Sequence, residues 1–260
     1  MSAKTNIKFV KLLPCAQLRP YIKYFAISEN EEEQEYKVLP GSGFVIGFQY
    51  KGKIANVKND LVDDLSTAGV TGISDAYKLF KSSANVGSVL VYFTETGFAH
   101  FAAHPAHELF NLSISLDDVF DKKSTARVVD QLSSVHTEDQ RIKIVEQFLI
   151  GQLKEIEADK LVIEAVKLIY QSKGTLRIKD LNEQLFISPS AFEKRFRKVV
   201  GTTAKKFASI VRFNAVIADL QDTNSLTQLC YDHHFFDQAH FIKEFKQFTG
   251  ETPDRFRKDL

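Results

Sequence analysis

The apolar residues of this chain change their spacing about halfway along, and the change divides the sequence into two parts. Residues 21–28, 38–50 and 88–94 are rich in β-branched and aromatic residues and are punctuated by glycine, which is typical of strands. The acidic run between the first two segments, residues 29–35, predicts an exposed hairpin loop. Residues 1–115 are therefore expected to be rich in β-structure.

From about residue 116 the apolar residues recur at helical spacing. Helices are expected over residues 116–120, 126–132, 138–153 and 160–171. Thr137 is a plausible start for the third, because the two carboxylates that follow it complement a helix dipole. These helices are expected to bridge the β-rich part and the C-terminal part. The polar stretch 152–159 holds the expected boundary, which divides the chain into domains 1–155 and 156–260.

The C-terminal part predicts seven short helices, with apolar residues at helical spacing and polar caps between them. Ser188 is a good N-cap, and Pro189 suits the first helical position, where its missing N–H would be unpaired in any case. Phe192 and Phe196 would line the inner face of that helix, and Gly201 sits where a left-handed C-cap belongs. A longer amphipathic helix is expected over residues 204–222.

The same pattern then appears a second time. Phe241 and Phe245 match Phe192 and Phe196, Gly250 matches Gly201, and Thr252 and Pro253 form another cap and first helical position. The sequence therefore predicts two helix-turn-helix units joined by one long helix. The expected fold class is α+β, with a β-rich N-terminal domain, bridging helices and an all-α C-terminal domain.

Composition narrows the class of protein. The 260 residues suit about two domains, and 44% are hydrophobic, which is enough to bury a core. No run of about 18 apolar residues is present, and the first residues lack an apolar signal region. The two cysteines, Cys15 and Cys230, are far apart and form neither a disulfide framework nor a zinc spacing. We therefore expect a cytoplasmic protein that does not span a membrane.

The net charge of +1 hides a local concentration of positive charge. Residues 161–260 hold 16 Lys and Arg against 12 Asp and Glu. The basic residues of one short segment, interleaved with phenylalanines, are Lys194, Arg195, Arg197, Lys198, Lys205, Lys206 and Arg212. Such a patch suits a phosphate backbone, and on charge alone a solvated helix face explains it equally well.

The last stretch of the chain resembles the signature of the AraC/XylS family of transcription regulators. The residues that carry the resemblance are Asp237, Gln238, Phe241, Phe245, Gly250, Thr252 and Pro253. In that family the segment is the second of two helix-turn-helix units in one DNA-binding domain. The resemblance implies a sequence-specific regulator whose partners are promoter DNA and RNA polymerase. The structural alternative is a small helical bundle with solvated charged faces.

The resemblance also places base contacts on the outward face of both recognition helices, where the side chains can reach base edges in the major groove. The candidates are Ser190, Glu193, Lys194 and Arg197 in the first unit and Gln238, Ala239, His240 and Lys243 in the second. The candidates for phosphate contacts, which give affinity without sequence information, are Arg195, Lys198, Lys205, Lys206, Lys246 and Arg257.

Four positions depart from the family pattern. The turn of each unit usually carries Gly, because a positive φ is comfortable there, but here the turns hold Phe186 and His234. Asn182 stands where a small apolar residue is usual, and Asp219 occupies a usual leucine position. The turns are therefore expected to be reshaped or slightly strained.

The N-terminal part resembles, more weakly, the cupin-like sensor domain of one branch of these regulators. The resemblance rests on residues 18–25, 39–41, 89–93 and 105–109. It implies a β-barrel that binds a small effector or supports a homodimer. Nothing in the sequence names the effector or its binding residues.

An enzyme is the alternative from another class. His100 and His104 are spaced i, i+4, with His107 and Glu108 nearby, which raises a metal-dependent cupin enzyme fused to a helix-turn-helix module. Pro105 interrupts that segment, so surface or packing histidines are the preferred interpretation. The hydrolase, P-loop, dinucleotide and zinc-protease motifs are missing from the sequence. We therefore expect no catalytic residues, no metal and no cofactor.

Overall fold

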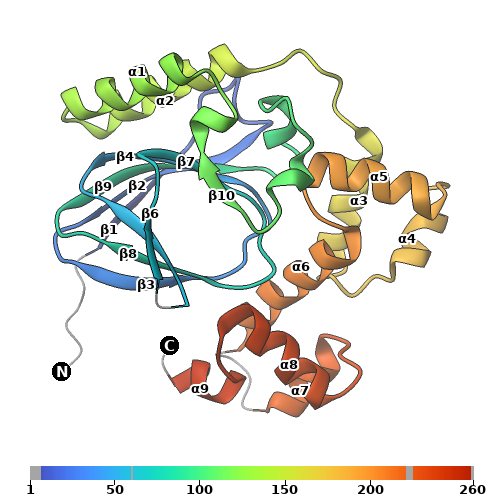
Figure 1. Ribbon diagram of the computed structural model, residues 1–260. Coiled ribbons are helices and arrows are strands. Elements are labelled where there is room, and N and C mark those ends of the chain that lie inside the picture. The colour runs from blue at the N-terminus through green and yellow to red at the C-terminus, as the bar shows by residue number, and fades with distance from the viewer. Residues whose placement is uncertain (1–6, 60, 221–224, 259–260) are drawn as a thin grey trace.

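Two antiparallel sheets form the N-terminal half of the computed structural model, which describes residues 7–59, 61–220 and 225–258 (Figure 1). The first sheet contains, in order, β1 (Lys8–Leu12), β2 (Ile22–Asn30), β9 (Val86–Phe93), β4 (Val45–Lys51), β7 (Ala68–Thr71) and β10 (Ser113–Ser115). The second contains β3 (Gln34–Val38), β8 (Lys78–Ser82), β5 (Ile54–Lys58) and β6 (Leu61–Asp64). The β-rich N-terminal part is therefore confirmed.

The acidic run includes the end of β2 and the start of β3, and it does not close a hairpin. β2 pairs with β1 and β9, whereas β3 pairs with β8, so the chain crosses from one sheet to the other at residues 31–33. The expected hairpin was wrong because local composition predicts the turn but not the partner of each flanking strand. The strand expected over residues 38–50 is likewise shorter, since β4 begins only at Val45, after Pro40 and two glycines.

Alternation along β4 divides its side chains between two environments, because successive strand residues point to opposite faces of a sheet. Ile46 and Phe48 are fully buried on the outer face, and Val45, Gly47 and Gln49 line the space between the sheets. The inner face therefore surrounds a cavity, and the outer face needs a cover.

Two helices supply this cover, α1 (Lys122–Ser134) and α2 (Glu138–Gln152), which lie across the first sheet in Figure 1. Phe148 of α2 packs edge-to-face against Phe48, with ring centroids 5.8 Å apart. Thr137 caps α2 in a capping box with Gln140, so the expected start is confirmed. The preceding segment forms only a short 3₁₀ helix, η3 (Leu116–Asp118), rather than a helix to residue 120. In the chain these helices link the strands to the C-terminal part; in space α1 and α2 pack on the sheet.

Seven helices follow within the described residues, as expected from the sequence. They are α3 (Lys160–Gln171), α4 (Ile178–Gln184), α5 (Pro189–Val200), α6 (Ala204–Asp219), α7 (Leu226–Asp232), α8 (Gln238–Thr249) and α9 (Pro253–Lys258). The long helix ends at Asp219, and its expected extension to residue 222 enters residues 221–224, which lie outside the described part. Figure 1 shows α6 running from the first group of helices to the second.

The expected N-cap Ser188 and the expected C-terminal glycines are confirmed, and Asp237 is an N-cap that the sequence did not predict. Ser188 and Asp237 accept hydrogen bonds from the backbone of the first turns of α5 and α8. Both helices end at a glycine in the left-handed region, Gly201 with φ 95° and Gly250 with φ 80°. Among the described residues, no helix has both the length and the apolar content needed to cross a membrane.

Candidate DNA-binding surface and ligand cavity

The helices α5 and α8 each bury an aromatic face and expose a polar one. Phe192 and Phe196 of α5 are fully buried, as are Phe241, Phe245 and Phe248 of α8. Phe213 of α6 packs against Phe245 and Phe248 with centroids 5.7 and 4.7 Å away. The joining helix therefore supplies part of the core of the second unit.

The expected base-contact residues lie on the faces opposite these phenylalanines. Ser190, Lys194 and Arg197 are exposed on α5, and Glu193 beside them is half-buried. They follow helical spacing, so they form one stripe along the helix. On α8 the exposed candidates are Gln238, Ala239, His240 and Lys243, all within its first two turns. Both stripes are accessible, which a base-reading surface requires.

Two of the α8 candidates are held by neighbours. The Gln238 amide donates a hydrogen bond to Thr227 Oγ1 over 2.6 Å, which ties α8 to α7. His240 Nε2 lies 3.6 Å from Glu244, whose carboxylate also accepts two hydrogen bonds from Arg212 at 2.9 and 3.0 Å. Arg212 belongs to α6, so this pair fixes α8 against the joining helix.

The expected phosphate contacts divide into two groups. Lys198, Lys205 and Lys246 are exposed. The other three form ion pairs: Arg195 with Asp159 at 2.7 Å, Lys206 with Asp75 at 2.8 Å and Arg257 with Asp254 at 3.1 Å. The Lys206–Asp75 pair joins the two halves of the chain, because Asp75 belongs to the N-terminal half and Lys206 to α6.

The unusual residues of the turns adopt the backbone that the family glycine would adopt. Phe186 has φ 51° and His234 has φ 53°, and the Phe186 side chain is 96% exposed. Asn182 is buried, and its side-chain oxygen accepts no hydrogen bond within the described structure. Asp219 lies 3.5 Å from Lys173 and 3.1 Å from the buried His233. Burial lowers the pKa of His233, so the neutral ring is favoured.

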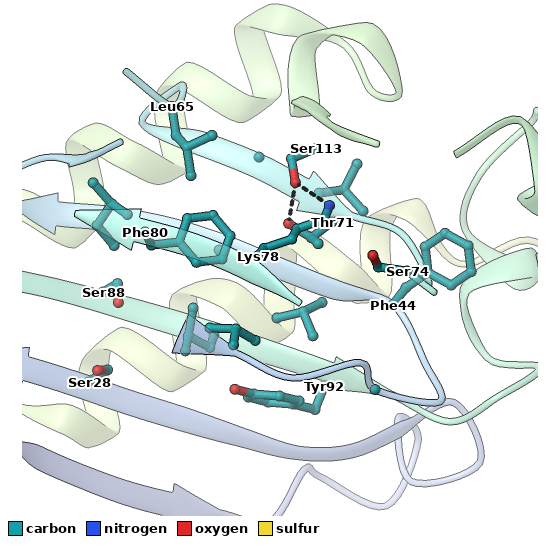
Figure 2. Close-up of a pocket in the computed structure, with 18 of the residues that line it drawn as sticks. Ser28, Phe44, Leu65, Thr71, Ser74, Lys78, Phe80, Ser88, Tyr92 and Ser113 are labelled. Carbon is teal, nitrogen blue, oxygen red and sulfur yellow. Dashed lines mark hydrogen bonds between the residues drawn. The ribbon is translucent and has the colours of Figure 1, made fainter. Parts of the chain in front are cut away.

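A cavity of about 760 Å³ lies between the two sheets. Its size falls within the range of about 300–1,000 Å³ that is typical of small-molecule pockets. Figure 2 shows Leu65 and Phe80 on one side, Tyr92 on the other and Phe44 at one end. Asn214 of α6 also lines it, so the cavity reaches the joining helix.

Lys78 is a cation on the wall of this cavity. Its ammonium donates to Ser113 Oγ at 2.9 Å, drawn in Figure 2, and to the Leu112 carbonyl at 3.1 Å. Burial lowers the pKa of Lys78 to about 8. Sequence analysis did not identify Lys78, because β8 alternates only weakly and its partner strands are distant in the chain.

The segment between β7 and β8 forms a wall between the cavity and the C-terminal helices. Ser74, Ala76 and Lys78 line the cavity. The intervening Asp75 pairs with Lys206 of α6, and its carbonyl accepts a hydrogen bond from Gln247 of α8 at 3.1 Å.

Other contacts also join the two halves. A Cβ on Gly250 would lie 2.7 Å from the Tyr77 ring, and one on Gly201 would lie 2.8 Å from the Phe44 ring. Glu251 forms an ion pair with Lys37 of β3. Tyr170 of α3 donates to Glu95 at 2.5 Å. One continuous core runs through both halves.

The histidines near residue 100 pack or pair separately. His100 is buried, with its ring 4.7 Å from that of Tyr21, and burial lowers its pKa. His104 Nδ1 lies 3.7 Å from Glu108 at the surface. Across the described residues, no group of three or more His, Cys, Asp or Glu is arranged to hold a metal.

Comparison with known families gives two matches. Residues 181–259 match a helix-turn-helix domain, and residues 10–115 match a domain of unknown function (DUF6597). The first match covers the segment from α4 through α5 and α8 to α9, and the second covers the sheets that surround the cavity.

Relatives bear the names of regulators. The chain is 29% identical over 121 residues to the Msm operon regulatory protein of Streptococcus mutans, covering 45% of this chain and 44% of that protein. It is 23% identical over 259 residues to an uncharacterised helix-turn-helix-type transcriptional regulator of Staphylococcus aureus MRSA252, covering 91% of this chain and 34% of that protein. The chain thus spans about half or less of the length of these relatives.

Among solved structures, ToxT from Vibrio cholerae is similar, with a TM-score of 0.48 and 11% identity over 91% of this chain and 98% of that one.

Proposed function

We propose that the chain is a transcription regulator of the AraC type, which binds promoter DNA in a sequence-specific manner; the matched helix-turn-helix domain and the relatives named as regulators support this. The observation that carries the proposal is the pair of capped helices α5 and α8. Each has a buried aromatic face and an exposed polar face, and α6 joins the two units. A single chain could then read two successive segments of the major groove, about 34 Å apart.

The proposed roles of the exposed side chains follow from their chemistry. Gln238 would read an adenine edge, Lys194, Arg197 and Lys243 would read guanine, and Glu193 would accept from cytosine. Ser190, Ala239 and His240 complete the two base-reading stripes. Lys198, Lys205 and Lys246, with Arg195, Lys206 and Arg257 once their ion pairs open, would contact phosphates.

The cavity supports control by a small effector. A pocket of this size, lined by both sheets and touched by α6, suits a ligand that changes how the two halves pack. We further propose that the chain is not an enzyme and that it recruits or excludes RNA polymerase. Because a regulator must reach the chromosome, we propose a cytoplasmic protein. We also propose that it can form a homodimer.

The direct test is fluorescence anisotropy with full-length protein, its own upstream promoter region and random DNA, at several salt concentrations. We expect tighter binding to the promoter, with a preference that persists as salt weakens both interactions. A double variant, Lys194→Ala with Lys243→Ala, should lose the preference. Failure to bind either DNA at low salt would refute the proposal.

A further inference from the structure

The charge of Lys78 sets the chemistry that the cavity can accept. Among the residues that the structure describes, three charged ones line the cavity: Lys23, Asp64 and Lys78. Lys23 pairs with Glu95, and Asp64 pairs with Lys53. Within the described part of the chain, Lys78 forms no ion pair and donates only to neutral oxygens. A half-buried ammonium without a counter-ion is costly, and an anion placed beside it would remove most of that cost.

The rest of the wall is mostly apolar. Phe80 follows Lys78 on the same face of β8, and Leu90 and Tyr92 face it from β9. The Tyr92 ring stacks on Tyr24 at 4.5 Å, which keeps this side flat and rigid. A molecule that fills the cavity therefore buries an apolar body, and a negative charge on it would pair with Lys78.

The residues next to Lys78 connect the cavity to the DNA-binding helices. Asp75 holds Lys206 of α6 and, through its carbonyl, Gln247 of α8. The Tyr77 ring fits against Gly250, at the end of α8. Since alternate residues of 74–78 face the cavity and the helices, a shift of Lys78 toward a bound anion would move Asp75 and Tyr77 with it.

We propose that the cavity binds a small organic acid with an apolar body, whose carboxylate pairs with Lys78, and that residues 74–78 transmit its presence to α6 and α8. This inference rests on the proposed function for its consequence on DNA but not for the binding itself. The two can therefore fail separately.

Isothermal titration calorimetry of the full-length protein tests the binding. The probes are aliphatic and aromatic monocarboxylates, beginning with octanoate and 4-phenylbutyrate, each compared with its uncharged primary amide. We expect the acids to bind about tenfold or more tightly than their amides, the range for a charge-assisted contact. Lys78→Met should bring the ratio close to one. The matched control is Lys81→Met on the same strand, whose lysine pairs with Glu33 and is absent from the cavity lining.

Three outcomes would overturn the binding proposal: equal affinity for acid and amide, a preference that survives Lys78→Met, or no binding of any acid in the series. None of them bears on DNA recognition, which the anisotropy experiment measures on its own. Acid binding without DNA binding would instead refute the proposed function and leave the cavity assignment standing.

Transmission is tested by repeating the anisotropy titration with saturating acid. The acid should change the wild-type dissociation constant for promoter DNA, and the change should fall toward none in Asp75→Asn, which lacks the charge that holds Lys206. An unchanged wild-type constant, or the same change in the variant, would overturn the coupling.

Discussion

The turn residue before each of the helices α5 and α8 holds a backbone that favours glycine. Phe186 and His234 have positive φ, and the helix before each ends there in the manner of a left-handed C-cap, with the amide of the next residue bonded to the carbonyl of Asn182 or Cys230. A side chain in this region costs about 1 kcal/mol or more. These turns are therefore formed despite their residues, because the packing of the helices on both sides determines them.

We expect Phe186→Gly to raise the free energy of unfolding by about 0.5–1 kcal/mol. The ring is 96% exposed, so little packing is lost when it is removed. Urea denaturation measures the difference. The opposite change, Gly201→Ala, should destabilise by about 1–3 kcal/mol, because φ is 95° and the new Cβ would meet the Phe44 ring at 2.8 Å. Loss of stability in Phe186→Gly would mean that the ring itself supports the turn.

Lys78 should reduce the stability of the ligand-free protein. Burial lowers its pKa to about 8 in the folded chain, from 10.5, so the folded state disfavours the charge. We expect Lys78→Met to raise the free energy of unfolding at neutral pH by about 1–2 kcal/mol, discounted for partial solvent contact. The gain should shrink between pH 8 and 10.5. In this range the unfolded wild-type protein binds more protons than the folded wild-type protein, so the wild-type free energy of unfolding rises with pH. Parallel urea titrations of wild type, Lys78→Met and Lys81→Met would show it; a pH-independent gain would contradict this account.

At the scale of the element, one helix carries candidates for both kinds of DNA contact. Lys243 and Lys246 are exposed on α8, one turn apart, and differ in their expected role. We expect Lys243→Ala to cost about 1–3 kcal/mol on the promoter and little on random DNA. Lys246→Ala should weaken both alike and reduce the salt dependence by about one phosphate contact. Anisotropy titrations decide it, and equal weakening by Lys243→Ala on both DNAs would make that residue a phosphate contact too.

The helices could be predicted from sequence because their signals are local. Ser188 caps α5, Thr137 caps α2, and the phenylalanines recur at the spacing of one helix face. The sheets were predicted less well, because pairing is decided by residues far away in the chain. The turn after β2 can be predicted from the acidic run, but the pairing of β3 with β8 cannot. Lys78 was missed for the same reason: only the pairing of distant strands turns it toward a cavity.

At the scale of the whole molecule, the N-terminal and C-terminal halves are packed together rather than merely linked. Tyr170, Asp75 and Lys37 each bond across the boundary, and Gly201 and Gly250 allow close approach. Such contacts join residues more than 70 positions apart, so no sequence pattern indicated them. These contacts join the cavity wall directly to α6 and α8, which is the connection that the proposed coupling requires.

The Asp75–Lys206 pair makes this dependence testable. Burial opposes the charge on Asp75, yet hydrogen bonds from Lys206 and Asn111 hold its pKa below the ordinary value. The ion pair is therefore fully formed at pH values above the ordinary pKa of a carboxyl group. It is lost only as the pH falls through the lowered pKa of Asp75, so a pH change near neutrality does not break it. It also neutralises a lysine that is proposed to contact phosphate. Removing the carboxylate charge should free that lysine for DNA.

We accordingly expect Asp75→Asn to tighten binding to promoter and random DNA by about 2- to 5-fold, the equivalent of one partly exposed ion pair. The dependence on salt should become steeper by about one phosphate contact. Asp64→Asn is the matched control, because Asp64 pairs with Lys53 within the N-terminal half. If Asp75→Asn instead weakened binding, the pair would hold α6 in the orientation that DNA requires, and the closed packing of the two halves would be the active one.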